Sequence, residues 1–278
     1  MRYLDPKNDL TFKKIFGEHP HLLKSFLNAM LPLDNGQLIE SIEYLASELP
    51  PRLPHMKHTI VDVRCKDNSG RQFIVEMQMC WTDDFKQRVV FNSSKAYIKQ
   101  LDKGDDYQAL QPVYALSLVN DIFEPKLEGF YHHYKIVHIE HSDKVIEGLE
   151  FVFVELPKFK PQNISDKRLQ VLWLRFLTEI KDGTSEISSE LFDYPDTKEA
   201  IACLQESSFT EAELEYYDKY WDSIQTEKTL FEGATKKGKI EGRIEGIIEV
   251  AEKLKSMGVD VVTIQKSTGL SKEEIEKL

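Results

Sequence analysis

Two stretches of alternating apolar and polar residues, 58–65 and 72–79, predict a pair of β-strands. Successive side chains of a strand point to opposite faces, so each stretch has one apolar and one polar face. The apolar face carries Val61, Val63, Cys65, Phe73, Val75, Met77 and Met79. The polar face carries Asp62, Arg64, Glu76 and Gln78, together with Ile60 and Ile74. The two isoleucines indicate that this second face is partly covered, and covered carboxylates need partners.

The segment between the strands predicts their register. The Asn-Ser-Gly loop at 68–70 suits a three-residue turn whose glycine adopts the left-handed conformation. This turn pairs Asp67 with Arg71 and sets Asp62 directly opposite Glu76. Directly opposed Cβ atoms lie about 4.5–5.5 Å apart, and like charges there are destabilising. We therefore expect a cation between the two acids, and hard oxygen ligands suit Mg²⁺ or Mn²⁺. The alternative interpretation is an amphipathic hairpin with a solvated polar face.

The rest of the pattern predicts a mixture of helices and strands, followed by helices alone. Asp9 begins the first predicted helix, either as its N-cap or as a further acid near the metal. Expected helices cover 9–30, 83–103, 166–181, 195–207, 211–229 and 238–257, and expected strands cover 38–45, 111–119, 135–140 and 151–156. A helical pair at 260–278 includes the capping box Ser271-x-x-Glu274. We divide the chain into 1–160, an acidic helical region at 161–232, and a Gly/Glu-rich helix with a small cap at 233–278.

Composition changes this picture in two ways. The net charge of −11 argues against a nucleic-acid partner, but residues 1–120 hold fifteen acids and fifteen basic residues, so the strand-containing part is neutral. Residues 185–232 carry most of the deficit. The chain has neither a run of eighteen apolar residues nor a signal-peptide core at its start, which predicts a cytoplasmic protein without membrane segments. Three cysteines without a CxxC spacing make a disulfide framework unexpected.

The polar residues of the hairpin resemble a known motif. Asp62, then thirteen residues, then Glu76-Met77-Gln78, preceded by the segment NDLTFKKIFG at 8–17, is similar to the recombination-promoting nucleases, which are also described as putative transposases. That family belongs to the PD-(D/E)XK nuclease superfamily. The resemblance extends to the helix at 85–101, with Arg88, Tyr97 and Gln100. It implies an α/β, restriction-endonuclease-like core, a mixed sheet flanked by helices, followed by a helical C-terminal region.

The resemblance also implies a metal-dependent DNA endonuclease linked to recombination, transposition or defence against foreign DNA. Mg²⁺, or Mn²⁺, would be held by Asp62, Glu76 and the Met77 carbonyl, with Asp9 as a further ligand. Gln78 stands where the superfamily has lysine, and Lys13 and Lys95 are candidates to replace that lysine. The expected catalytic residues are Asp62, Glu76, Gln78 and Lys13, and the expected phosphate-binding residues are Arg64, Arg88 and Lys95. The missing lysine leaves an alternative open: a decayed nuclease fold that binds nucleic acid or protein.

Glycines recur every fourth residue near the C-terminus, at 238, 242 and 246. Glycine costs roughly 1 kcal/mol relative to alanine inside a helix, so three in register indicate close approach of another backbone. A homodimer through this helix is one interpretation, and a weak connector helix is the other.

Overall fold

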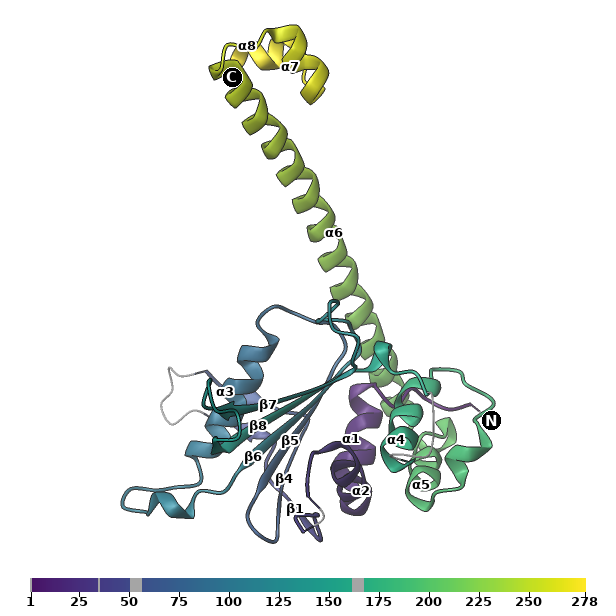
Figure 1. Cartoon of the computed structure of the whole chain (residues 1–278). Coiled ribbons are helices and arrows are strands. Elements are labelled where there is room, and N and C mark those ends of the chain that lie inside the picture. The colour runs from purple at the N-terminus through teal and green to yellow at the C-terminus, as the bar shows by residue number, and fades with distance from the viewer. Residues whose placement is uncertain (1, 35, 51–56, 162–167) are drawn as a thin grey trace. The chain divides into compact units, whose positions relative to one another are not determined.

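The computed structural model describes residues 2–34, 36–50, 57–161 and 168–278, and its main sheet is mixed and has six strands (Figure 1). Its strand order is β1-β4-β5-β6-β8-β7, and a separate two-stranded ribbon joins β2 to β3. The strands are β1 (Ile42–Tyr44), β2 (Glu48–Leu49), β3 (Thr59–Ile60), β4 (Val63–Asp67), β5 (Gln72–Gln78), β6 (Val113–Val119), β7 (Tyr131–Val137) and β8 (Val145–Glu155). The pairs β5–β6 and β6–β8 are parallel, and β1–β4, β4–β5 and β7–β8 are antiparallel. The predicted α/β fold is therefore confirmed.

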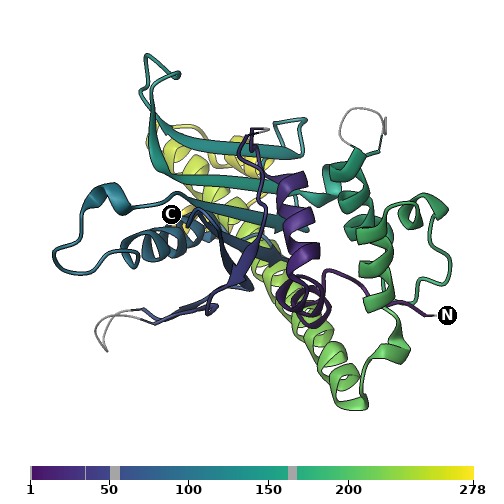
Figure 2. The same cartoon turned by 90° about the horizontal axis from the view of Figure 1, so that it is seen from below.

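Helices cover both faces of this sheet. The α-helices are α1 (Asp9–Glu18), α2 (Pro20–Met30), α3 (Phe85–Ile98), α4 (Arg168–Glu179), α5 (Pro195–Cys203), α6 (Glu211–Ser256), α7 (Val261–Thr268) and α8 (Lys272–Lys277). Short 3₁₀ turns cover Tyr107–Ala109, Leu156–Lys158, Ser189–Phe192 and Glu206–Ser208. In Figures 1 and 2, α3 lies on one face of the sheet and α1 and α2 lie on the other, with α4 and α5 outside them. All seven residues of β6 are buried, as expected for a parallel strand covered on both sides.

The register of the β4–β5 hairpin agrees with the prediction. Gly70 has φ 86°, and the Asp67 N–H donates to the Arg71 carbonyl at 3.0 Å. The Asp67 carboxylate also accepts from the Arg71 N–H at 2.9 Å and from Arg71 Nε at 2.7 Å, which fixes the turn. The observed register runs from Lys66–Gln72 to Val63–Val75 and ends one residue short of Asp62 and Glu76.

The backbone bends at Asp62, which the alternation does not reveal. Residues 61–62 interrupt the predicted strand, so β3 pairs with β2 whereas β4 pairs with β5. Val61 consequently packs with Ile74 and Ala96 on the α3 side, so its assignment to the face of Val63 was wrong. The covering of the polar face is confirmed at Ile74, which is 2% exposed, but not at Ile60, which is 60% exposed.

The helix expected at 9–30 is two helices. Pro20 cannot donate a backbone hydrogen bond, so α1 ends at Glu18 and α2 begins at Pro20. Asn8, not Asp9, is the N-cap of α1: its side chain accepts from the Leu10 N–H at 3.0 Å. Asp9 is left at the first helical position with its carboxylate available for other contacts.

The helices after β8 pack onto the N-terminal pair. Trp173 of α4 is fully buried, and its ring centroid lies 5.6 Å from that of Phe16 and 5.5 Å from that of Phe26. Contacts divide the chain into two units, Met1–Trp221 and Asp222–Leu278. The division at 160 and 232 stays a prediction.

A continuous α6 of 46 residues replaces the two helices expected at 211–229 and 238–257. The glycines at 233 and 238 do not end it. Within the second unit, Ala251 is buried with Ile264 of α7 and Ile275 of α8, and the predicted capping box of Ser271 and Glu274 is present. None of the described helices combines the length and apolar content that a membrane crossing requires.

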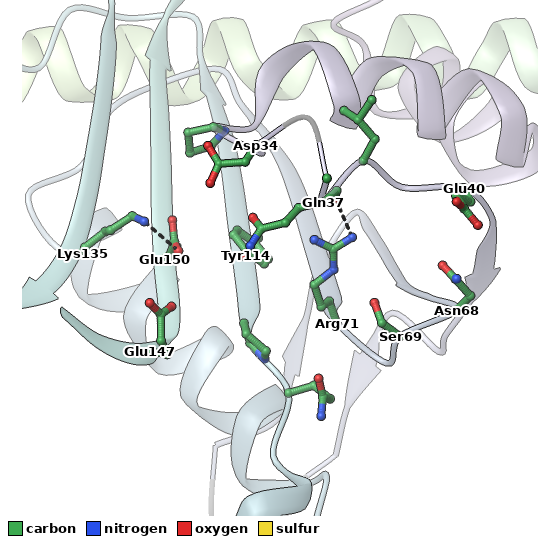
Figure 3. Close-up of a pocket in the computed structure, with 15 residues that line it drawn as sticks. Asp34, Gln37, Glu40, Asn68, Ser69, Arg71, Tyr114, Lys135, Glu147 and Glu150 are labelled. Atoms are coloured by element: carbon green, nitrogen blue, oxygen red, sulfur yellow. Dashed lines mark hydrogen bonds and ion pairs between the residues drawn. The ribbon is translucent and has the colours of Figure 1, made fainter.

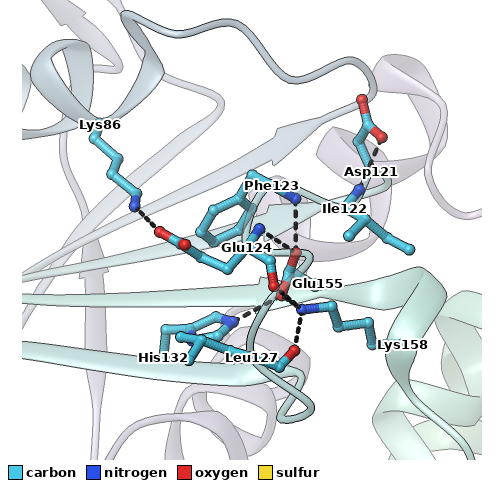
Figure 4. A network of polar contacts seen from close by, with 9 residues as sticks. All are labelled: Lys86, Asp121, Ile122, Phe123, Glu124, Leu127, His132, Glu155 and Lys158. Carbon is cyan, nitrogen blue, oxygen red and sulfur yellow. Dashed lines mark hydrogen bonds and ion pairs between the residues drawn. The ribbon is translucent and has the colours of Figure 1, made fainter.

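The buried carboxylate of Glu155 lies at the C-terminal end of β8, next to the loop at 120–130 (Figure 4). Glu155 accepts from the N–H groups of Phe123 (2.7 Å) and Glu124 (3.0 Å), and it pairs with His132 (2.8 Å) and Lys158 (2.5 Å). Burial disfavours the charged form, but these donors outweigh it and hold the pKa of Glu155 below its ordinary value. The network is structural, since every group in it already has a partner.

Candidate active site

Asp62 and Glu76 come from neighbouring backbone segments beneath α3. Asp62 stands at the bend before β4, and its Oδ2 accepts from the Met77 N–H at 2.7 Å. Glu76 lies near the end of β5 and is 8% exposed. In a strand, the N–H and C=O of one residue point toward the same neighbour. The Met77 carbonyl therefore faces the side of Asp62.

Both carboxylates are poorly solvated. Burial raises the pKa of Asp62 to about 6, with a further rise from Asp9, although the Met77 N–H and Lys13 lower it. Burial and the charge of Asp62 raise the pKa of Glu76 to about 7, against the opposing effects of Asn92 and Arg88. The pair is therefore short of positive charge at neutral pH.

Gln78 is held at both ends of its amide. Its Oε1 accepts from Arg88 Nη2 at 2.5 Å, and its Nε2 donates to the Cys80 carbonyl at 2.6 Å. The Arg88 guanidinium lies over the Phe85 ring, 4.8 Å from its centroid, and its charge lowers the pKa of both acids. Gln78 thus brings a cation from α3 to the end of β5.

Lys13 supplies a second cation from the other face. Its Nζ pairs with Asp9 Oδ1 at 2.6 Å, one turn earlier on α1, and its charge acts on Asp62. The Asp9 carboxylate is engaged with Lys13 and with the Tyr216 hydroxyl, at 3.0 Å. Asp9 therefore lies near the acids, but its carboxylate is paired with Lys13.

Two other residues that were predicted to bind phosphate, Arg64 and Lys95, donate their hydrogen bonds to other parts of the chain. Arg64 donates to Gln72 Oε1 (2.8 Å) and to the Ala46 carbonyl (3.4 Å). Lys95 is 7% exposed, and its ammonium donates to the carbonyls of Leu49 and Lys57 and to Thr59 Oγ1. An ammonium has three donors, so those of Lys95 are already used by the β2–β3 ribbon. Its position does not support the expected phosphate contact.

Sequence reasoning missed two contributors. Asn92 of α3 is 2% exposed and donates to Glu76 Oε1 at 3.1 Å. A buried asparagine inside an amphipathic helix is a signal that could have been noticed. Tyr216 comes from α6, about 150 residues along the chain from the acids, where no local pattern links it to them.

The donor set fits a divalent cation. Among the described residues, Asn92 Oδ1 is buried without a hydrogen-bond partner, so acceptors outnumber donors around Glu76. Within the same part of the chain, no group of three or more His, Cys, Asp and Glu side chains could hold a metal ion. Two carboxylates, a carbonyl and water are the set that Mg²⁺ commonly uses, whereas zinc prefers His and Cys.

A polar pocket of about 650 Å³ lies elsewhere on the same unit (Figure 3). Its lining includes Tyr114 and the pair Lys135–Glu150, with Nζ 3.2 Å from Oε1. Arg71 at its wall donates to the Gln37 carbonyl at 2.7 Å and is also paired with Asp67. None of the acids of the candidate site lines this pocket.

Comparison with known families agrees with this geometry. A family model described as PD-(D/E)XK nuclease family transposase matches residues 6–232. The chain belongs to this family. The match includes the whole sheet, both acids and the first turns of α6. PD-(D/E)XK nucleases generally use divalent metal ions, and the family implies a DNA substrate. Searches of curated proteins and of solved structures found no match.

Proposed function

We propose that this chain is a Mg²⁺-dependent DNA endonuclease that acts in the cytoplasm in recombination, transposition or defence against foreign DNA. The proposal rests chiefly on Asp62, which is half-buried, and Glu76, which is buried: both have raised pKa values, the charge of Asp62 acts on Glu76, and Lys13 and Arg88 supply cations on either side. Such an arrangement costs stability, so its presence indicates a function. Carboxylates with perturbed pKa values are frequent at active sites. Family membership supports the nuclease chemistry.

Asp62, Glu76 and the Met77 carbonyl would hold the ion. When bound, Mg²⁺ or Mn²⁺ polarises a phosphodiester and makes a water molecule a better nucleophile. The Met77 N–H fixes the orientation of Asp62, and Asn92 fixes that of Glu76. The protein therefore presents preoriented oxygens, which must be ionised to act as ligands.

The two cations would act on the phosphate. Arg88, oriented by Gln78, and Lys13, oriented by Asp9, would stabilise the negative charge that develops as the P–O bond breaks. Gln78 keeps its amide hydrogen bonds and acts by aiming Arg88. Lys13 would replace the lysine that the superfamily carries at the position of Gln78.

A cleavage assay on supercoiled plasmid tests the proposal. The wild-type protein should nick or linearise the plasmid in Mg²⁺ or Mn²⁺ but not in EDTA, and Asp62→Asn should reduce the rate at least 100-fold. Glu128→Gln, at an exposed carboxylate, is the matched control and should cleave normally. Cutting that survives Asp62→Asn would show that another site, or a contaminant, is responsible.

The missing lysine favours a second candidate, a catalytically decayed fold that binds nucleic acid or protein. Its signature is plasmid binding without cutting, together with a thermal stability that does not respond to millimolar Mg²⁺ or Mn²⁺. A ligand that binds only the native state must raise its stability.

Homodimerisation through the C-terminal helix also belongs to this proposal. Phe231, Ile240 and Ile244 are 60%, 52% and 50% exposed on α6, and a Cβ added at Gly242 would meet no atom within 4 Å. Light scattering of the full chain and of a chain ending at Phe231 tests this. A dimer mass for the full chain together with a monomer mass for the truncated chain supports the dimer, and a monomer mass for the full chain, or a dimer mass for both, contradicts it.

A further inference from the structure

The first turns of α6 contact α1 and the residues just before it. The Asp5 N–H donates to the Tyr217 hydroxyl at 2.9 Å, and Asn8 Nδ2 donates to the Tyr217 carbonyl at 3.2 Å. Lys14 pairs with Glu213 at 3.1 Å. Tyr217 itself is 1% exposed, packed with Leu4 and Phe209. These contacts hold the helix in place without any help from its neighbour Tyr216.

Tyr216 makes a different kind of contact. It is 50% exposed, and its hydroxyl donates to Asp9 Oδ2 at 3.0 Å. The other oxygen of the same carboxylate, Oδ1, accepts from Lys13 Nζ at 2.6 Å. A chain of two hydrogen bonds therefore runs from α6 through Asp9 to the ammonium beside Asp62.

We propose that Tyr216 is a positioning residue of the nuclease site, which acts through Asp9 to aim the Lys13 ammonium at the metal-binding carboxylates. The effect on cleavage rests on the proposed function, whereas the effect on Lys13 does not.

The physical reason is the freedom of a lysine side chain. Lysine ends a flexible four-carbon stem, and an ion pair between residues i and i+4 on a helix surface is weak when its partner is free to rotate. Tyr216 removes that rotation by occupying the second oxygen of Asp9, and tyrosine itself has few rotatable bonds. The lysine that the superfamily carries on its strand needs no such support. A lysine on a helix, such as Lys13, does need this support.

The first test measures Lys13 directly, without DNA or metal. The full chain is labelled with a limiting amount of acetic anhydride, and mass spectrometry compares the labelling of Lys13 with that of Lys253, which pairs with Glu249 farther along α6. Tyr216→Phe should raise the relative labelling of Lys13 about threefold, and Asp9→Asn should raise it further. Glu215→Gln is the matched control on the same helix turn and should leave Lys13 unchanged. Equal labelling of Lys13 in wild type and Tyr216→Phe overturns the proposal.

The second test is a double-mutant cycle on plasmid cleavage. Tyr216→Phe should lower kcat about 5–10-fold with little change in KM, and Lys13→Met should lower it more. In the Lys13→Met background, Tyr216→Phe should cost less than twofold, because its target is gone. Multiplying effects would mean that Tyr216 acts independently of Lys13, and an unaffected kcat in Tyr216→Phe would mean that its contact does not serve the reaction. Either overturns the proposal.

The two tests separate the hypotheses. If the wild-type protein cuts no DNA, the proposed function fails while the labelling result still decides whether Tyr216 positions Lys13. Thermal unfolding of Tyr216→Phe should match that of wild type within about 2 °C, since the Tyr217 and Glu213 contacts keep α6 docked.

Discussion

Removing a charge from the site should stabilise the metal-free protein. Glu76 is 8% exposed and the charge of Asp62 acts on it, so its ionised form is unfavourable in the folded state. Glu76→Gln keeps the shape of the side chain and its contact with Asn92 but carries no charge. We therefore predict that this variant is more stable than wild type at pH 8 in EDTA, although its catalytic function is lost.

The pKa of Glu76 gives the size of the effect. A rise from 4.5 to about 7 corresponds to about 3 kcal/mol at pH 8, because each pKa unit is worth about 1.4 kcal/mol. We expect about 2 kcal/mol, since Asp62 and Arg88 readjust once the charge is gone. In a chain of this size, that is a rise in Tm of roughly 4–8 °C.

The sign of the pH dependence follows from proton binding. Between about pH 4.5 and 7 the folded wild type holds a proton on Glu76 that the unfolded chain has lost, so its stability falls as pH rises. The advantage of Glu76→Gln should therefore be under about 1 kcal/mol at pH 5, grow up to pH 7 and stay constant above it.

Thermal unfolding by circular dichroism from pH 5 to 8 in EDTA measures this, with Glu128→Gln as the control at an exposed carboxylate. At pH 8, 10 mM Mg²⁺ should stabilise wild type by about 1.4 kcal/mol for a Kd of about 1 mM, and Glu76→Gln much less. A Tm at pH 8 in EDTA that is equal to or below that of wild type would refute the reasoning.

Three further changes have defined outcomes. Glu155→Gln removes the charge that four donors share, and chemical denaturation should show a loss of about 3–5 kcal/mol. Lys95→Met leaves the Leu49 and Lys57 carbonyls without their donor, so stability should fall by about 1–3 kcal/mol, while cleavage per folded molecule stays unchanged. Arg88→Met removes a charge that lowers the pKa of both acids. Plasmid cleavage should therefore be slower, and the acidic limb of its pH–rate profile should move to higher pH. An unmoved limb would exclude an effect of Arg88 on the pKa values of the acids.

The hairpin could be predicted because its information is local. A glycine at position 70 and an alternation of two fix the register of β4 and β5 from Lys66–Gln72 to Val63–Val75. The bend at Asp62 was not predictable, because it depends on β2 pairing with β3, an interaction between segments separated by an irregular loop.

The supporting residues could not be predicted because they come from distant elements. Asn92 reaches Glu76, and Tyr216 reaches Asp9, only after α3 and the first turns of α6 have packed into place. The break between α1 and α2 was missed although Pro20 signals it, because the apolar period continues across it. In α6 the predicted helix with glycines at 238, 242 and 246 is present, but it is continuous with the helix expected at 211–229.

The most direct test of the central claim is the anomalous scattering of Mn²⁺ in crystals of the wild-type protein and of Glu76→Gln, soaked under the same conditions. We predict an anomalous difference peak in wild type that is bonded to carboxylate oxygens of both Asp62 and Glu76, and its loss or strong reduction in the variant. A wild-type crystal with no peak between these two side chains, or a peak there that Glu76→Gln leaves unchanged, would contradict the account.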